Sequence, residues 1–386
     1  MQHTATIYCQ NLLHQSEEYE SDGLFEGRLG KIWWYFHEWK ATRSQTIKAQ
    51  CLALIEEVFT HLNNDAPQLY GASLSGGAAG FGYVVTHLHR AEWLDFDLNQ
   101  TLADLDEFIY ESALEHIQQR KLDFWHGAFG MLFYFLERLP HHRQRAEVLI
   151  QKIVEQVQGD DDGLWFPNVM REEDEPIINF SLSHGQTAFM LVLMQAAQKG
   201  IEEELVLSVV ARGVNFLLRH QRAVDYVTDF SYFPLCVHAN TAEPRYNNRL
   251  AVCYGDLNLV LLMYKAAAFF DNAALKKRAD LLGLNTLRRQ NEQATLVSDS
   301  HFCHGAAGVA QFYHSLYRIS GQEGYYKGYQ YWIDRTIAAL HQDLATDAFR
   351  ETKGGLVSGY AGVALVLLTY IYHQRERLYW EKVFLL

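Results

Sequence analysis

Proline and cysteine are scarce in this sequence. Only six prolines occur in 386 residues, and because proline interrupts helix interiors, their scarcity is compatible with many long helices. The five cysteines are too few and too scattered for a disulfide framework. A reducing, cytoplasmic setting is therefore expected.

Long apolar runs and basic clusters are also missing. No stretch reaches the roughly eighteen consecutive apolar residues of a membrane-spanning helix, and residues 1–6 lack the features of a secretory signal. We therefore expect no transmembrane segment. The formal net charge of −13, without a basic run, argues against binding to nucleic acid or to anionic membranes.

Seven short glycine-centred phrases recur along the chain. Their lead glycines are Gly27, Gly77, Gly127, Gly185, Gly255, Gly305 and Gly359. A period of about fifty residues indicates a repeated supersecondary unit. Since the repeat covers nearly the whole chain, we expect residues 1–386 to form a single domain of seven helical hairpins.

An apolar stretch follows each lead glycine, as in residues 127–139, 185–197 and 359–372. Helices that are apolar on all sides are buried, so these stretches predict inner helices. Segments with one apolar stripe precede most phrases and predict outer helices. These segments are 46–62, 102–118, 144–158, 202–220, 272–289 and 325–344.

The predicted fold is all-α, an α/α toroid of seven inner and seven outer helices. Closing the hairpins into a ring leaves no exposed apolar end, whereas an open solenoid would need polar capping repeats. One step, from Gly185 to Gly255, is longer than the others, and its surplus lies within residues 221–250. A loop of this length is usually functional or disordered, and we expect it to form a lip over the active site.

Two of the phrases carry a cysteine two places before the lead glycine, namely Cys253 and Cys303. His304, His184 and His126 each lie one place before theirs. In a ring of equivalent hairpins these positions meet at one end, so Cys253, Cys303 and His304 are expected to be neighbours. Two thiolates and an imidazole with one open position are typical of a catalytic zinc site. We therefore expect one Zn²⁺ per chain.

The phrases 252–255 (VCYG) and 302–305 (FCHG), set among repeated Gly-x-x-Gly turns, resemble the lanthionine synthetase C (LanC) family of lanthipeptide cyclases. The resemblance covers nearly the whole chain, in repeat number and in motif order. It implies an α/α toroid around one zinc ion. It also implies an enzyme that adds a cysteine thiol of a dehydrated precursor peptide to dehydroalanine or dehydrobutyrine, forming a thioether ring. A dehydratase and an exporter are the partner proteins that it implies.

The resemblance assigns roles to seven residues. The implied zinc ligands are Cys253, Cys303 and His304, and the implied active-site residues are His184, Asp123, Arg249 and Tyr254.

Each active-site residue has an expected task. His184 is expected to protonate the enolate, because histidine titrates near the working pH. Asp123 would hold the His184 ring, although it could also cap the following helix. Arg249 would stabilise the enolate or anchor Asp123, and Tyr254 is expected to pack beside the metal. His126 has no counterpart in the resemblance and is expected to be structural.

The sequence departs from the family pattern at three positions. Val252 stands where the family usually has tryptophan, and Ala188 and Asn258 replace the second glycine of their phrases. These changes put local packing in question rather than metal binding.

Four other functions are open at this point. A LanC-like protein could add glutathione or another small thiol to electrophilic residues. A non-catalytic peptide-binding toroid could hold a structural zinc, but a fourth ligand in register is missing. A protein prenyltransferase β-subunit would need a basic diphosphate pocket. An α/α glycosidase could use Asp123, Glu26 or Asp256, but it would leave the two cysteines unexplained.

Overall fold

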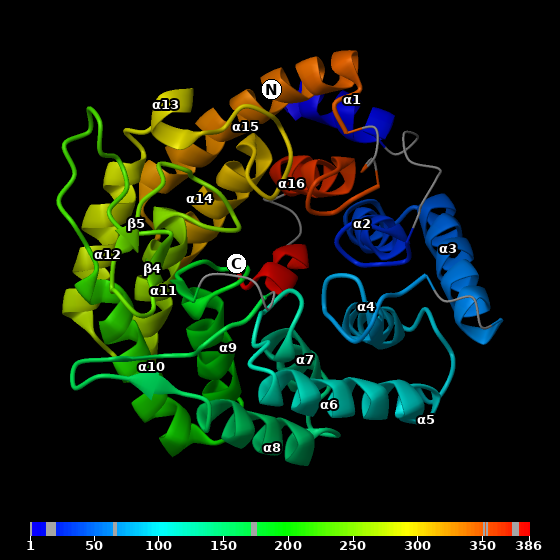
Figure 1. The fold of residues 1–386 in the computed structure, drawn as a ribbon. Helices are drawn as coiled ribbons and strands as arrows, with labels where there is room; N and C mark the ends of the chain where they lie inside the picture. Colours follow the sequence, from blue (N-terminus) through cyan, green and yellow to red (C-terminus); the bar gives the residue numbers. More distant parts are fainter. Residues whose placement is uncertain are drawn as a thin grey trace. The chain divides into compact units, whose positions relative to one another are not determined.

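The computed structural model is mostly helical (Figure 1). It describes residues 2–12, 21–64, 68–170, 176–349, 352, 354–372 and 378–386. These residues form sixteen α-helices, five short strands and one 3₁₀ helix, η1 (Trp380–Phe384). The predicted helical character is confirmed.

Each of the seven lead glycines immediately precedes a helix. These helices are α2 (Arg28–Thr42), α4 (Ala78–Arg90), α7 (Ala128–Glu137), α9 (Gln186–Gln198), α11 (Asp256–Phe269), α14 (Ala306–Ser320) and α16 (Tyr360–Tyr372). They are buried on nearly all sides: every residue of α7 from Ala128 to Leu136 is buried. The glycine phrases therefore predict both where these helices begin and that they are buried.

The predicted outer helices are also present. They are α3 (Gln45–Asn63), α6 (Ala103–Gln118), α8 (Arg143–Val154), α10 (Glu203–Arg219), α12 (Ala273–Thr286) and α15 (Glu323–Thr346). In α8 only the stripe of Ala146, Leu149, Ile150 and Ile153 is buried. Shorter helices are α1 (Gln2–Leu12), α5 (Leu98–Thr101) and α13 (Glu292–Thr295).

Glycine is required at the lead positions because the preceding loop folds back on itself. A Cβ atom on Gly127 would lie 2.3 Å from the carbonyl oxygen of Lys121, and one on Gly185 would lie 2.1 Å from that of Asn179. Real Cβ atoms do not approach backbone this closely. Gly255 also has a φ of +116°, which side-chain-bearing residues rarely adopt.

The strands were not predicted. Strands β1 (Gln158–Gly159) and β2 (Leu164–Trp165) pair antiparallel, and the first occupies the predicted end of the 144–158 helix. Strands β3 (Ile177–Asn179), β4 (Cys236–His238) and β5 (Pro244–Arg245) form an antiparallel sheet in the order β3-β4-β5. Thus the long segment 221–250 pairs with the strand just before His184.

The chain divides into two compact units. The first comprises residues 1–106, 298–313 and 327–383, and the second comprises residues 107–297, 314–326 and 384–386. In the first unit α16 packs against both α1 and α2, so the two ends of the repeat series lie side by side. In the second unit α9 packs against α7, α10 and α11.

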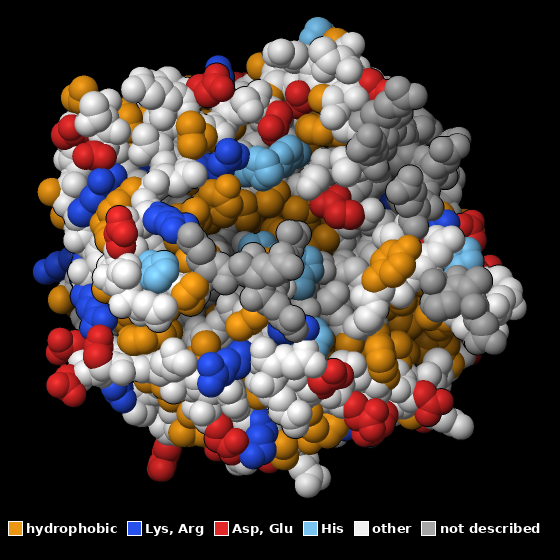
Figure 2. All heavy atoms as spheres, in the orientation of Figure 1, with side chains coloured by type: hydrophobic (Ala, Val, Ile, Leu, Met, Phe, Trp, Pro, Cys, Tyr) orange, Lys and Arg blue, Asp and Glu red, His pale blue; other side chains and the backbone are white. Residues whose placement is uncertain are grey.

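Charge is mixed on the surface. On the face drawn in Figure 2, acidic and basic side chains are interspersed among the described residues. No helix in the described part of the chain has the length and apolar character needed to cross a membrane.

Candidate functional site

The loops before the glycine-led helices are joined in register by backbone hydrogen bonds. In the first unit, residues that lie two places before a lead glycine bond to one another from loop to loop. The N–H of Phe25 donates to the carbonyl of Ser75 (2.9 Å), that of Val357 to the carbonyl of Phe25 (3.1 Å), and that of Cys303 to the carbonyl of Val357 (3.0 Å). In the second unit Ser183 N–H donates to the carbonyl of Cys253 (3.3 Å). These bonds place Cys253 and Cys303 at equivalent positions of their loops, as the register predicts.

Asp123 and His184 form a hydrogen-bonded pair in the second unit. His184 Nδ1 lies 2.8 Å from Asp123 Oδ2, and the carboxylate is 5% exposed. Since a carboxylate only accepts, the ring nitrogen donates. The other oxygen, Oδ1, accepts the N–H groups of Trp125 and His126, each at 2.8 Å. Asp123 therefore both caps the turn before α7 and holds His184.

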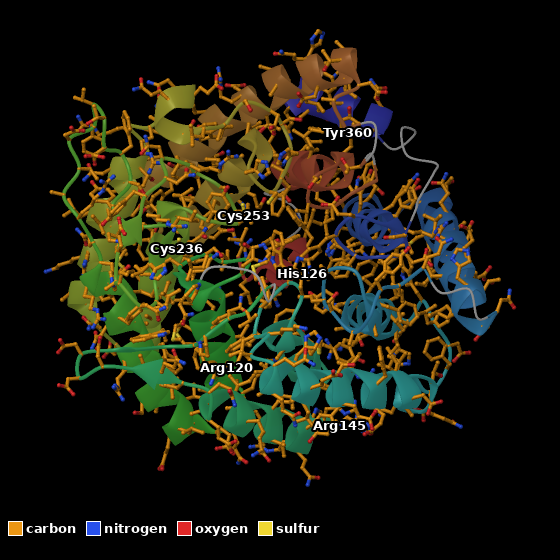
Figure 3. The ribbon with its side chains drawn as sticks, viewed as in Figure 1. Arg120, His126, Arg145, Cys236, Cys253 and Tyr360 are labelled. Atoms are coloured by element: carbon orange, nitrogen blue, oxygen red, sulfur yellow. The ribbon has the colours of Figure 1, made fainter. Side chains whose placement is uncertain are left out.

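Two rings enclose the imidazole of His184. The Trp125 ring meets it nearly edge-on, with centroids 5.1 Å apart, and the His126 ring stacks on it at 5.5 Å and 14°. His126, on the loop leading into α7, is exposed and is labelled in Figure 3. Backbone contacts fix His184 further, since its N–H donates to Ser181 Oγ (2.9 Å) and its carbonyl accepts from Asn168 (3.0 Å).

The two histidines differ in their proton affinity. Burial is the largest influence on the pKa of His184 and lowers it, but the hydrogen bond and charge of Asp123, with the charge of Cys253, outweigh it, so the pKa is raised. The pKa of His126 is lowered, because the surrounding protein partly desolvates its ring even though the side chain reaches the surface. Environments that separate the pKa values of neighbouring groups are typical of acid–base sites, and here His184 is the ring with the higher proton affinity.

The loop that carries Cys253 is tied to the loop of His184. The carbonyl of Cys253 accepts from Leu182 N–H (3.1 Å) and from the Ser183 hydroxyl (3.2 Å). Asn258, which is fully buried, accepts from Leu182 N–H (2.9 Å) and donates to the carbonyl of Val252 (3.1 Å). The asparagine that replaces the second glycine of this phrase therefore links the two loops.

In the first unit, Cys303 and His304 lie just before α14. Cys303 is 8% exposed and His304 is half-buried. The ring of His301 meets that of His304 at 4.1 Å and 88°, and its Nε2 lies 3.4 Å from Asp299 Oδ1. His301 thus restricts the orientation of the His304 ring.

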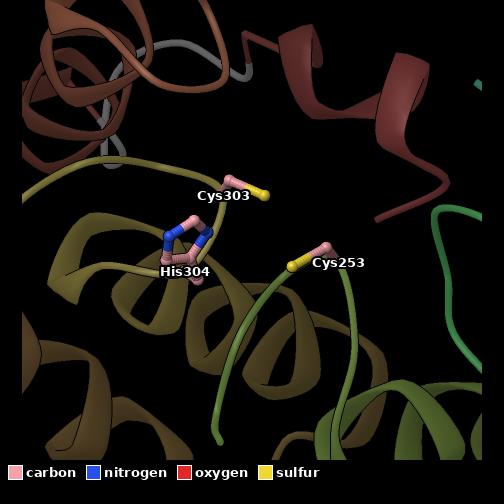
Figure 4. Close-up of side chains that lie close together, drawn as sticks. All are labelled: Cys253, Cys303 and His304. Atoms are coloured by element: carbon pink, nitrogen blue, oxygen red, sulfur yellow. The ribbon is translucent and has the colours of Figure 1, made fainter. Parts of the chain in front are cut away.

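Cys253 of the second unit and Cys303 and His304 of the first are candidate metal ligands. Each offers one ligand atom, and Figure 4 labels the three side chains. Two thiolate sulfurs and one imidazole nitrogen suit zinc, which binds them at about 2.3 and 2.0–2.1 Å. The donor set therefore fits a zinc ion with one position left for another ligand.

Asp123, His126 and His184 also offer donor atoms within 4.8 Å of one another. Their arrangement suits proton transfer better than metal binding. The two rings are nearly parallel, so their in-plane lone pairs do not converge. In addition, Nδ1 of His184 is already paired with the carboxylate.

Arg249 and Tyr254 flank Cys253 on the same loop. The Arg249 guanidinium lies 5.9 Å from the centre of the Tyr254 ring. Asp123 and Arg249 have no ion pair among the described residues. A role as anchor of Asp123 therefore has no support in the structure, whereas a substrate-facing role stays a prediction.

A buried ion pair that the sequence did not predict holds segment 221–250 in place. Arg289 Nη1 lies 2.7 Å from Asp256 Oδ2, and both side chains are at most 1% exposed. The carboxylate accepts the N–H groups of Tyr232 (3.1 Å) and Phe233 (3.0 Å), and Arg289 donates to the carbonyl of Asn248. The pair thereby joins both parts of the segment to the start of α11.

Comparison with known proteins decides the family. The family model described as "Lanthionine synthetase C-like protein" matches residues 18–385. The chain belongs to this lanthionine synthetase C-like family. Among solved structures the chain is similar to "Nisin cyclase", with a TM-score of 0.78 and 19% identity, over 99% of this chain and 95% of that one. None of the curated proteins matches the sequence.

The likeness to nisin cyclase is a likeness of fold. Nisin cyclase is an α/α toroid, and the match confirms the predicted fold class for this LanC-like chain. At 19% identity it does not transfer activity or residue roles. The residue assignments therefore depend on the geometry described above.

Proposed function

We propose that this LanC-like protein is a zinc-dependent lanthionine synthetase. It adds a cysteine thiol of a dehydrated precursor peptide to dehydroalanine or dehydrobutyrine and so closes a thioether ring. The observation that supports this most is the three-residue donor set of Cys253, Cys303 and His304, with the Asp123–His184 pair, whose histidine lies on a loop that hydrogen-bonds to Cys253. The reaction needs two things from the protein: a metal that activates the thiol of the substrate, and a proton donor.

The three ligands would hold one zinc ion with a vacant position. When bound, zinc deprotonates a coordinating thiol that is otherwise mostly protonated at neutral pH. Both cysteines are buried, at 4% and 8% exposed, which limits the access of water to the sulfurs. His301 meets the His304 ring edge-on and would help to hold that ring in place as a zinc ligand.

His184 supplies the proton that completes the addition. The substrate sulfur forms a bond to the β-carbon, the π electrons of the double bond move toward the carbonyl oxygen, and the α-carbon then takes a proton. The thiol loses one proton and the α-carbon gains one, so the peptide mass does not change. His184 suits this step because its pKa is raised and its Nε2 is not the nitrogen paired with Asp123.

Asp123, Arg249 and Tyr254 would assist. Asp123 fixes the tautomer and orientation of His184, because its carboxylate accepts from Nδ1. Arg249 would stabilise the negative charge of the enolate. Tyr254 would pack beside Cys253 and orient the Arg249 guanidinium, which lies over its ring.

The remaining assignments belong to the same proposal. The chain would act as one domain in the cytoplasm, with segment 221–250 close to the substrate. A dehydratase would supply its substrate, and an exporter would take up the cyclised product.

Reconstitution with a dehydrated peptide tests the proposal. The substrate should contain one dehydrobutyrine and one cysteine, and the reaction is run with and without glutathione. Cyclisation is scored as loss of the alkylatable thiol without a change in peptide mass. A glutathione adduct would instead support small-thiol addition, and binding without reaction would support a non-catalytic peptide binder.

A further inference from the structure

Residues 378–386, which no sequence motif singled out, are largely buried. Leu378, Trp380, Val383, Phe384, Leu385 and Leu386 are all at most 8% exposed, with Trp380 and Phe384 at 0%. Tyr379, at 36%, and Lys382 are the exposed residues of the segment. A segment with this pattern is packed into the protein rather than laid over its surface.

Trp380 anchors the segment in the first unit. Its indole N–H donates to Thr369 Oγ1 (2.8 Å), and its carbonyl accepts from the Trp33 indole (3.3 Å). Its ring meets that of Phe302 at 5.1 Å and 63°. Phe302 directly precedes Cys303 and is fully buried, so Trp380 packs behind a proposed zinc ligand.

Phe384 belongs to the second unit and reaches the acid–base pair. Its ring lies 6.4 Å from that of Trp125, at 70°. Trp125 in turn contacts the His184 imidazole. Phe384 therefore packs against the ring that bounds one side of His184.

We propose that residues 378–386 are a positioning segment for the site. Phe384 supports the His184 ring through Trp125, and Trp380 supports the Cys303 loop through Phe302. Both are positioning residues, since each acts through another side chain. The expected effect of this segment on turnover rests on the proposed function. Its expected effects on zinc binding and on the His184 ring can be measured without turnover.

The reasoning predicts separable effects for the two ends of the segment. Catalytic groups must be held within a fraction of an ångström, and a misplacement of about 1 Å can cost roughly 100-fold in rate. Phe384→Ala should therefore lower kcat about 10- to 100-fold with unchanged zinc content. Trp380→Leu should weaken zinc binding about 10- to 100-fold, the range seen when groups around metal ligands are altered.

The experiment compares Phe384→Ala, Phe384→Leu and Trp380→Leu with Tyr379→Ala. Tyr379 is an exposed aromatic in the same segment and serves as the matched control. Measurements are the melting temperature, zinc affinity, kcat and KM, and the NMR signal of the His184 Nδ1 proton. We expect Phe384→Ala to broaden that signal and Trp380→Leu to leave it unchanged.

The outcomes are distinct. If both core variants lower only the melting temperature and keep wild-type zinc affinity, kcat and His184 signal, the proposal is wrong. Equal losses in Tyr379→Ala would also overturn it. Should Phe384→Ala not fold, Phe384→Leu is judged by the same criteria. If the wild type does not cyclise peptides but the zinc and NMR effects appear, the proposed function fails while the positioning role stands.

Discussion

Replacing Asp123 by asparagine isolates the contribution of its charge. Asparagine keeps an oxygen for the N–H groups of Trp125 and His126, so the turn before α7 should survive. The amide NH₂ group of asparagine would replace Asp123 Oδ2, which lies 2.8 Å from His184 Nδ1. This hydrogen bond would therefore be lost. A hydrogen bond to a charged group contributes about 1.5–3 kcal/mol. Since each 1.36 kcal/mol is tenfold in rate, kcat should fall about 10- to 150-fold.

The pH dependence should change as well. In the wild type Asp123 and Cys253 raise the pKa of His184 against the opposing effect of burial. Without the Asp123 charge, burial weighs more and the pKa falls. The protonated imidazole is the acid form, so the alkaline side of the kcat profile, where this form is lost, should move to lower pH.

The assay is the thiol-loss reaction followed by mass spectrometry across pH, with zinc content measured for each preparation. Asp160→Asn is the control, because Asp160 also pairs with a cation, Arg219 at 2.6 Å, but lies outside the site. A variant Asp123→Asn with kcat within twofold of wild type and an unshifted profile would refute the acid role of His184.

Three further predictions concern metal, stability and loop geometry. Cys303→Ala should lose zinc and cyclisation together, whereas Cys51→Ala, at a buried cysteine outside the glycine phrases, should keep both; metal analysis of the purified variants decides this. Burial raises the pKa of Glu38 from 4.5 to about 7, so its ionisation destabilises the fold progressively between these values. Glu38→Gln should thus be about 1–3 kcal/mol more stable than wild type above pH 7 and no different below pH 4.5 in urea unfolding. Asn258→Ala removes the amide that accepts from Leu182 N–H and donates to the Val252 carbonyl, and leaves Leu182 only its bond to the Cys253 carbonyl. Each lost hydrogen bond should cost about 0.5–1.5 kcal/mol in the same assay, with zinc affinity reduced; an unchanged unfolding midpoint would contradict this.

Much of the fold is readable from the sequence because the repeat is strict. The lead glycines mark helix starts, since the folded-back loop before each leaves no room for a Cβ atom. The same register predicts that Cys253 and Cys303 occupy equivalent loop positions, which the backbone hydrogen bonds bear out. Helix ends are predicted less accurately: the pattern predicts a helix up to residue 158, whereas α8 ends at Val154.

Other features have no local signal. Strands of two or three residues, such as β1 and β4, are too short to show an alternating pattern. Arg289 meets Asp256 from 33 residues away, and nothing in either neighbourhood indicates the partner. In the sequence, Asn258 is only a departure from the second glycine of its phrase. In the structure, its amide links the loop of Leu182 to the loop of Val252.

In the candidate site, too, some features could be predicted from the sequence and others could not. The paired Asp123 and His184 could be predicted because the family resemblance points to both, although their roles stay proposals. His126 was expected to be structural, and its stacking on His184 could not be inferred from a shared register alone. The support of Trp125 by Phe384 joins residues far apart in the chain, which only the folded structure reveals.

X-ray absorption at the zinc edge tests the central claim most directly. Freshly purified protein should contain one zinc per chain, bound by two sulfurs at about 2.3 Å and one imidazole nitrogen at about 2.0–2.1 Å. Adding a cysteine-containing dehydrated peptide should raise the count from two sulfurs to three. A protein without zinc, or a zinc ion already bound by four protein ligands and indifferent to the peptide, would contradict the account.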